Sequence, residues 1–157
     1  MKEPQALNSV ARFHRLFGHP IEKKPLIPAA ERCQLRIDLL QEELDELRQA
    51  IADGNLTEVA DALCDLQYVL AGAVLEFGMG WVFAELFDEV QRSNMSKACR
   101  SRQEAEATVD HYRQQGVAAY YEEKDELFLV YRQADRKTLK SVNYSPADLT
   151  GILARQR

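Results

Sequence analysis

The chain has 157 residues, of which 46% are hydrophobic and 29% are charged, and its formal net charge is −5. This length and composition predict one globular domain, spanning residues 1–157, with enough apolar side chains to bury a core. No apolar run approaches the roughly 20 residues of a membrane-spanning helix, and residues 1–9 lack the apolar centre of a signal peptide. We therefore expect a cytoplasmic protein without membrane contacts.

Cysteine and histidine residues are scattered singly along the chain, without the CxxC or HExxH spacing of common zinc sites. This spacing argues against disulfides and against a zinc centre, so we expect the cysteines to pack in the core. The residues concerned are Cys33, Cys64, Cys99, His14, His19 and His111.

Four helices are predicted in the first two thirds of the chain. A proline-rich loop over residues 18–28 separates the first from the second, and the dipeptide Asp53-Gly54 ends the second. Asn55, with Glu58 three residues later, has the spacing of a helix N-cap. The predicted helices span residues 8–17, 29–52, 55–77 and 81–93.

Carboxylates form two short rows on the two long helices. Residues three or four apart lie on one helical face, which groups Glu42, Glu43 and Glu46 on one helix and Asp61 with Asp65 on the next. If the helices pack antiparallel, the rows face each other and repel unless a cation lies between them. Hard divalent cations with oxygen ligands, above all Mg²⁺, suit this arrangement.

An acidic run on a helix is more often a solvated face, and this alternative has to be weighed. The predicted helix over residues 55–77 argues against a solvated face, because its residues 69–75 are apolar on almost every side. A helix that is apolar all round is buried all round. One chain has too few long helices to cover it, so we expect a homodimer or higher homo-oligomer to complete a four-helix core.

Basic and aromatic residues gather in two later segments. The third long helix ends in the sequence RSNMSK, and residues 134–149 read ADRKTLKSVNYSPADL. Bases at a helix C-terminus also suit its dipole. The basic patch in residues 134–149 is short and the chain as a whole is acidic, so we do not expect polynucleotide binding. The candidate ligand contacts are Arg92, Asn94, Lys97, Lys137, Lys140 and Tyr144.

Residues 103–132 read as an appendage to the helical body. A helix over 103–115 is followed by two β-rich runs around the polar sequence EEKDE, which is typical of a hairpin. The sequence assigns no function to this part.

From FHRLFG through EVQRSNMSK to DRKTLKSVNYSPADL, the chain resembles the all-α nucleoside triphosphate pyrophosphatase superfamily, which includes MazG-like, phosphoribosyl-ATP pyrophosphohydrolase-like and dimeric dUTPase-like proteins. The signature of that superfamily is EExxE followed by ExxD on a second helix. Glu42, Glu43 and Glu46 match its first half.

The second half of the signature departs from the family pattern. With Asp65 at the aspartate position, the glutamate position holds Ala62, and Asp61 supplies the nearest carboxylate. The alternative register pairs Glu58 with Asp61. We favour Asp61 and Asp65, because DALCDLQYV resembles a DxxxD form of the motif.

The resemblance implies an all-α, MazG-like helical bundle completed by oligomerisation. It implies hydrolysis of a nucleoside triphosphate between its α- and β-phosphates, giving the monophosphate and pyrophosphate. Mg²⁺, or Mn²⁺ in its place, would be held by the catalytic carboxylates, with the basic segments contacting the substrate. The alternatives are phosphoribosyl-ATP hydrolysis and a non-catalytic nucleotide-binding helical dimer. The carboxylates concerned are Glu42, Glu43, Glu46, Asp61 and Asp65.

Overall fold

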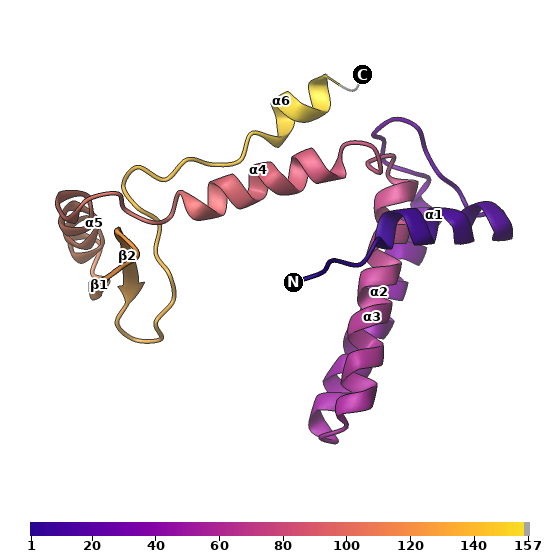
Figure 1. The fold of residues 1–157 in the computed structure, drawn as a ribbon, viewed down its shortest axis with the longest axis horizontal. Coiled ribbons are helices and arrows are strands. Elements are labelled where there is room, and N and C mark those ends of the chain that lie inside the picture. Colours follow the sequence, from indigo (N-terminus) through magenta and orange to yellow (C-terminus); the bar gives the residue numbers. More distant parts are fainter. Residues whose placement is uncertain (156–157) are drawn as a thin grey trace. The chain divides into compact units, whose positions relative to one another are not determined.

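The computed structural model describes residues 1–155, which form six helices and one two-stranded antiparallel hairpin (Figure 1). This confirms the mostly helical prediction with a small hairpin near the C-terminus. The helices are α1 (Ala6–Phe17), α2 (Ala30–Ala52), α3 (Leu56–Glu76), α4 (Phe83–Met95), α5 (Arg102–Gln114) and α6 (Leu149–Ala154), and the strands are β1 (Ala119–Lys124) and β2 (Leu127–Arg132).

The chain divides into two compact units. The first contains Met1–Phe83 and the C-terminal residues from Leu153, and the second contains Ala84–Ile152. No helix in the described residues is both long and apolar enough to span a membrane.

The long hairpin of α2 and α3 is the main element of the first unit, where the two helices lie side by side (Figure 1). Gly54 turns the chain with a φ of 65°, and the Asn55 side chain accepts hydrogen bonds from the backbone N–H groups of Thr57 and Glu58 at 3.2 and 3.4 Å. The N-cap predicted at Asn55 is therefore confirmed.

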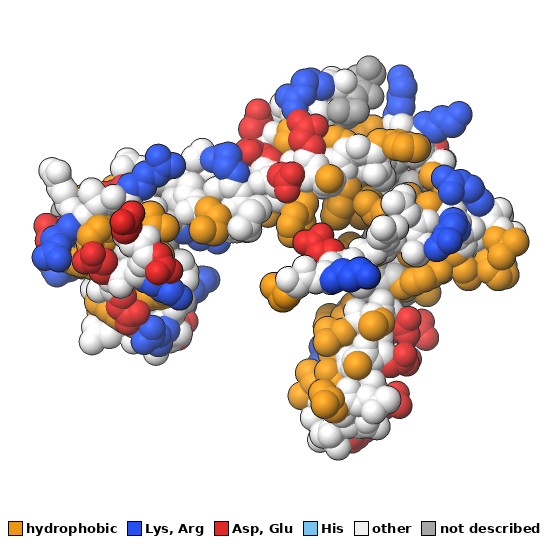
Figure 2. All heavy atoms as spheres, viewed as in Figure 1, with side chains coloured by type: hydrophobic (Ala, Val, Ile, Leu, Met, Phe, Trp, Pro, Cys, Tyr) orange, Lys and Arg blue, Asp and Glu red, His pale blue; other side chains and the backbone are white. Residues whose placement is uncertain are grey.

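Apolar side chains form two rows along the hairpin, and both rows are exposed in the single chain. Each row repeats every seven residues, and the six side chains are 41–80% exposed. By contrast, Ala50 and Ala62 are buried in the hairpin, and Leu40, Leu47, Val59 and Leu66 are half-buried. Figure 2 shows hydrophobic side chains along one side of the hairpin and acidic ones along another. The rows are Ile37, Leu44 and Ile51, and Leu56, Leu63 and Leu70.

The closed core of the first unit lies where α1 packs on α3. Val10 and Ala11 contact Ala71 and Leu75, and all four are buried. The loop after α1 is fixed to the end of α3, because the backbone N–H of Glu22 donates to Leu75 O at 3.0 Å. The loop therefore fastens α1 to the hairpin.

A buried ionic cluster joins the same three helices. The Glu76 carboxylate is 1% exposed and accepts hydrogen bonds from the guanidinium groups of Arg32 and Arg36. Nδ1 of His14 donates to Pro20 O at 2.8 Å, which leaves Nε2 as an acceptor 3.4 Å from Arg36 Nη2. Burying a charge is tolerated only with such partners.

Opposing effects set the ionisation of this cluster. Burial alone would raise the pKa of Glu76, but the hydrogen bonds from Arg36 and Arg32 outweigh it and lower that pKa. Burial lowers the pKa of His14 below 6.5; the Pro20 carbonyl opposes this shift, and the positive charge of Arg36 adds to it. At neutral pH the cluster therefore holds a neutral imidazole beside one carboxylate and two guanidinium groups.

The second unit is built on α5 and the hairpin, as predicted for the appendage. β1 and β2 pair in the register Ala119↔Arg132 to Lys124↔Leu127, and α5 packs on them. Their core consists of Cys99, Ala105, Val130 and Leu139. Leu139 joins this core through a backbone hydrogen bond to Val130 O at 2.8 Å, which brings the C-terminal segment back towards α5.

We predict that the protein loses stability as the pH falls below about 6.5, the value at which His14 titrates in the unfolded chain. Because the pKa of His14 is lowered in the fold, the unfolded state binds more protons there, so acid favours unfolding. Urea unfolding at pH 7.5 and 5.5 measures the effect. His14→Gln should remove part of this dependence, and an unchanged dependence in that variant would contradict the assignment to His14.

Candidate functional site

Five carboxylates lie near the middle of the α2–α3 hairpin. Glu42, Glu43 and Glu46 project from α2, and Asp61 and Asp65 project from α3. Glu43 and Asp65 are half-buried, whereas the other three side chains are exposed. The antiparallel packing therefore places both predicted rows at the same level of the hairpin.

Electrostatic coupling shows that these groups lie close together. The pKa of Glu43 is raised, first by burial and then by the negative charges of Asp65, Glu46, Glu42 and Asp61. Like charges around one carboxylate disfavour its ionised form. The structure therefore brings all five predicted site residues into one mutually repelling group around Glu43.

The departure from the EExxE–ExxD pattern has a structural counterpart at Ala62. This residue is 3% exposed and lies in the seam between the helices, where a methyl group fits. Asp61 precedes it on the exposed surface of α3, and Glu58 lies in the first turn of the helix beside the Asn55 cap. Asp61 therefore supplies the carboxylate on α3 that acts on Glu43 together with Asp65.

The donor chemistry of this group fits a hard divalent cation, because all of its ligands are carboxylate oxygens. Within residues 1–155, no Lys, Arg or His forms an ion pair with any of the five. In the same residues, no group of three or more His, Cys, Asp or Glu side chains is already arranged to hold a metal ion. Metal binding would therefore require some of these five side chains to move.

The six candidate ligand contacts lie in the second unit, and five of them share one region. Lys97 Nζ donates to Asn94 Oδ1 at 2.7 Å, and Lys97 O accepts the backbone N–H of Ser141 at 3.2 Å. Lys140 Nζ lies 4.4 Å from the centre of the Tyr144 ring, as in a cation–π contact. The RSNMSK and KSVNYSPADL segments thus pack against each other.

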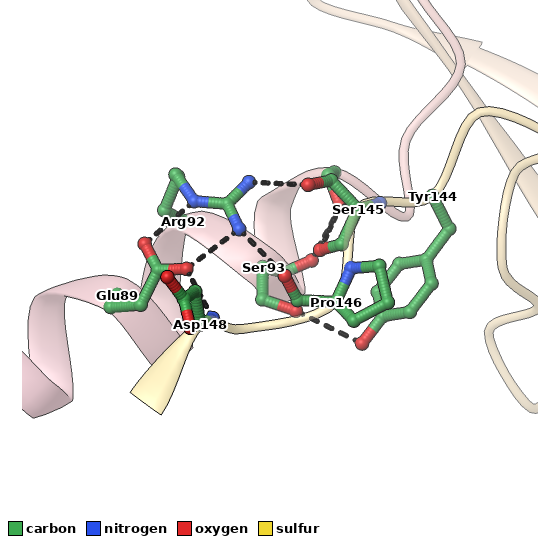
Figure 3. Close-up of polar contacts among 8 residues, drawn as sticks. Glu89, Arg92, Ser93, Tyr144, Ser145, Pro146 and Asp148 are labelled. Carbon is green, nitrogen blue, oxygen red and sulfur yellow. Dashed lines mark hydrogen bonds and ion pairs between the residues drawn. The ribbon is translucent and has the colours of Figure 1, made fainter. Parts of the chain in front are cut away.

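Arg92, the fifth member of this group, clamps the C-terminal segment to α4 (Figure 3). It forms a two-pronged ion pair with Glu89 at 2.7 and 2.8 Å, and it also donates to Ser145 Oγ at 3.1 Å and to Pro146 O at 3.0 Å. Arg92 and the Asp148 backbone N–H lower the pKa of Glu89 to about 2, so the pair stays charged at neutral pH.

Lys137, the sixth candidate, lies in the turn after β2. Its backbone N–H donates to Asp135 Oδ1 at 3.1 Å, and its carbonyl accepts the backbone N–H of Arg132 at 2.9 Å. These contacts belong to the turn itself.

Two polar groups were not found from the sequence. One is the buried cluster of Glu76 with Arg32 and Arg36, and the other is the set of α4 side chains that hold the C-terminal segment. The only local signal for the second was Glu89 three residues before Arg92, which is a common spacing for a helix ion pair. The further members of that set are Ser93 and Ser96.

Comparison with known proteins gives two findings. Residues 10–94, just over half of the chain, match the phosphoribosyl-ATP pyrophosphohydrolase family. "Uncharacterized protein L479" of Acanthamoeba polyphaga mimivirus is 23% identical over an alignment that covers 92% of this chain and 94% of that protein. The matched residues include all five carboxylates, Arg92 and Asn94.

The family match covers the α2–α3 hairpin and α4, and it indicates a hydrolase with a pyrophosphohydrolase-like function. The viral relative, itself uncharacterised, shows that the likeness extends past residue 94. The chain belongs to the phosphoribosyl-ATP pyrophosphohydrolase family, within the MazG-like all-α nucleoside triphosphate pyrophosphatases.

Proposed function

We propose that the protein is a cytoplasmic, Mg²⁺-dependent nucleoside triphosphate pyrophosphohydrolase that serves the nucleotide pool. It would cleave a ribo- or deoxyribonucleotide between the α- and β-phosphates and release the monophosphate and pyrophosphate. The observation that carries this proposal is the group of five coupled carboxylates around Glu43. Family membership supports the same reaction class.

The carboxylates would hold the metal, with Mn²⁺ as a possible substitute for Mg²⁺. Glu42, Glu43, Glu46, Asp61 and Asp65 are the proposed ligands, and one of the glutamates would orient the attacking water. When bound, the metal neutralises charge on the phosphate oxygens and makes a nearby water a better nucleophile. Phosphoanhydride hydrolysis otherwise needs positioning more than covalent chemistry from the protein.

The basic candidates would bind the anionic end of the substrate. Lys97, Lys137 and Lys140 carry the charge, Asn94 offers an amide, and Tyr144 offers a ring for the base or sugar. The packing of Lys97 against the segment that carries Lys140 and Tyr144 supports this assignment for three of the five. Arg92 was predicted with them, but its hydrogen bonds are made to Glu89 and to the C-terminal segment.

Two alternatives have specific support. The description of the matching family favours phosphoribosyl-ATP itself as the substrate. The buried Ala62 at the family's glutamate position favours a nucleotide-binding dimer without catalysis. The RSNMSK and KSVNYSPADL segments favour a nucleotide-pool enzyme over both.

We also propose that the two apolar rows of the hairpin bind the rows of a second copy. Each residue of one row has a counterpart in the other row that is equally far from the turn in sequence. The pairs are Ile37 with Leu70, Leu44 with Leu63, and Ile51 with Leu56. An antiparallel hairpin therefore places each pair at one level, which gives a flat apolar face two side chains wide. A seven-residue repeat is the pattern with which helices pack in four-helix bundles.

The first test is release of pyrophosphate from canonical, deoxy and modified nucleoside triphosphates and from phosphoribosyl-ATP, with Mg²⁺ or with EDTA. We expect Mg²⁺-dependent release of the monophosphate and pyrophosphate from one or a few triphosphates. Turnover of phosphoribosyl-ATP alone would favour the first alternative. Nucleotide binding without turnover in Mg²⁺ or Mn²⁺ would favour the binding dimer.

Glu43→Gln and Asp65→Asn should each lower turnover at least about a hundredfold, because losing even an outer partner of a metal ligand costs 10- to 100-fold. The raised pKa of Glu43 shows that its charge is disfavoured in the fold, so Glu43→Gln should raise the melting temperature of the metal-free protein at neutral pH. Glu58→Gln, a carboxylate on α3 outside the group, is the matched control. Loss of activity in the control would instead support the alternative register.

Leu44→Lys and Leu63→Lys should each convert the oligomer to a monomer, because a charge would then be buried at the centre of the apolar face. Light scattering coupled to size-exclusion chromatography measures the mass of each variant. Gln49→Lys adds the same charge to an exposed polar position of α2 that is neither three nor four residues from any member of the rows, and it should leave the oligomer intact. A wild-type chain that is already monomeric would contradict the proposed interface.

A further inference from the structure

Residues 139–148, here called the C-terminal strap, are held to α5 by side chains. The Tyr112 hydroxyl donates to Lys140 O and accepts the Lys140 backbone N–H, both at 3.2 Å. One residue later, the Ser141 hydroxyl donates to the Glu104 carboxylate. Ser141 is 4% exposed, so this end of the strap is built into the second unit.

The other end of the strap is held to α4 in the same way. Ser96 Oγ accepts the backbone N–H of Ser145 at 2.9 Å, and Glu89 accepts that of Asp148 at 2.8 Å. The Tyr144 hydroxyl and Ser93 Oγ are 2.9 Å apart. Figure 3 shows Arg92 between Glu89 on one side and Ser145 and Pro146 on the other.

These anchors fix one exposed cation. Lys140 lies at the end of the strap that is anchored to α5, and its ammonium group lies on the face of the Tyr144 ring. The backbone of Lys140 is held by Tyr112, and the ring of Tyr144 is held through its hydroxyl, so neither part has to be ordered when a ligand arrives. A contact that is ordered in advance costs less conformational entropy on binding.

Arg92 is committed to this arrangement. Its hydrogen bonds use four of the five N–H groups of a guanidinium, two on Glu89 and two on the strap. Glu89 in turn neutralises the charge of Arg92 and fixes the Asp148 backbone. A guanidinium used in this way has little capacity left for a phosphate.

We propose that the C-terminal strap holds Lys140 and Tyr144 as a preformed contact for the phosphates of the nucleotide, and that Glu89 and Arg92 are positioning residues for this contact. The proposal rests on the proposed function for the identity of the ligand. Glu89 and Arg92 would then hold the strap in place, and Arg92 would not contact the phosphates itself.

The variant Glu89→Ala distinguishes this proposal from direct phosphate binding by Arg92, because the two hypotheses predict different changes in KM. If Arg92 binds phosphate itself, removing its partner frees its charge, and KM falls or stays unchanged. If Glu89 and Arg92 hold the strap, KM rises by about tenfold, the size of the effect when one charge-assisted hydrogen bond is lost. Turnover at saturation should stay close to that of the wild type.

Three further measurements on the full chain sharpen the result. Hydrogen exchange at the Ser145 and Asp148 amides should quicken in Glu89→Ala. Arg92→Lys should behave like Glu89→Ala, because lysine keeps the charge but cannot form the fork. Lys140→Ala should raise KM, and adding Glu89→Ala to it should raise KM by less than Glu89→Ala does in the wild type, since Glu89 acts in part through Lys140.

The matched control is the pair of Asp110 and Arg113 on α5, which has the same spacing of three residues and a contact of 2.7 Å. Arg113→Ala should change neither KM nor exchange in the strap. Circular dichroism shows whether Glu89→Ala is still folded. The milder variant Glu89→Gln, which keeps the size of the side chain, provides a second test if Glu89→Ala unfolds.

The outcomes separate failure of this inference from failure of the proposed function. A lower or unchanged KM in Glu89→Ala, or faster exchange without any change in KM, overturns the inference. If the wild-type protein hydrolyses no nucleotide, the proposed function fails, and affinity for inorganic triphosphate becomes the readout. That affinity must then fall in both Glu89→Ala and Lys140→Ala, and a wild-type protein that does not bind triphosphate overturns the inference as well.

Discussion

Two helices packed as a hairpin bury only the side chains along the single line where they touch. This constraint decides which side chains of α2 and α3 are covered in the first unit. Ala50 and Ala62 are buried in the α2–α3 hairpin and Leu40, Leu47 and Leu66 are half-buried, whereas six other large apolar side chains lie in two exposed rows. The same packing half-buries Glu43 near Asp65, and burial first, followed by the negative charge of Asp65, raises the pKa of Glu43. The exposed apolar face and the carboxylate group therefore have one structural cause.

The ionic cluster of Glu76 with Arg32 and Arg36 supports this hairpin at its other end. A Cβ at Gly72 would lie 2.7 Å from Arg36 Nη1, so the absence of a side chain there leaves room for the guanidinium beside α3. The Arg36 Nε has no hydrogen-bond partner within the described structure, so the site holds a polar atom that is not fully compensated. Such a cluster fixes one geometry for α1 at some cost in stability.

The elements were predictable because their signals are local. Pro28, Asp53-Gly54 and Asn55 bound the long helices in the sequence as they do in the structure, and the spacing of Glu43 with Glu46 and of Asp61 with Asp65 predicted both carboxylate rows. Contacts between distant residues left no such signal. Arg36 and Glu76 are 40 residues apart, and Arg92 and Ser145 are 53 apart. Helical periodicity also cannot tell whether an apolar row is covered by the same chain or by another.

The two units carry opposite parts of the proposed chemistry. The carboxylate group of the first unit has no cationic side chain paired with it among residues 1–155, so it can attract a metal but repels a polyphosphate. The lysines that would attract the polyphosphate lie in the second unit, and Lys97 and Lys140 fall after residue 94, where the family match ends. The carboxylate hairpin is thus the part that the chain shares with its family. We therefore expect the selectivity of this chain to depend on the strap and on the helix and hairpin that hold it.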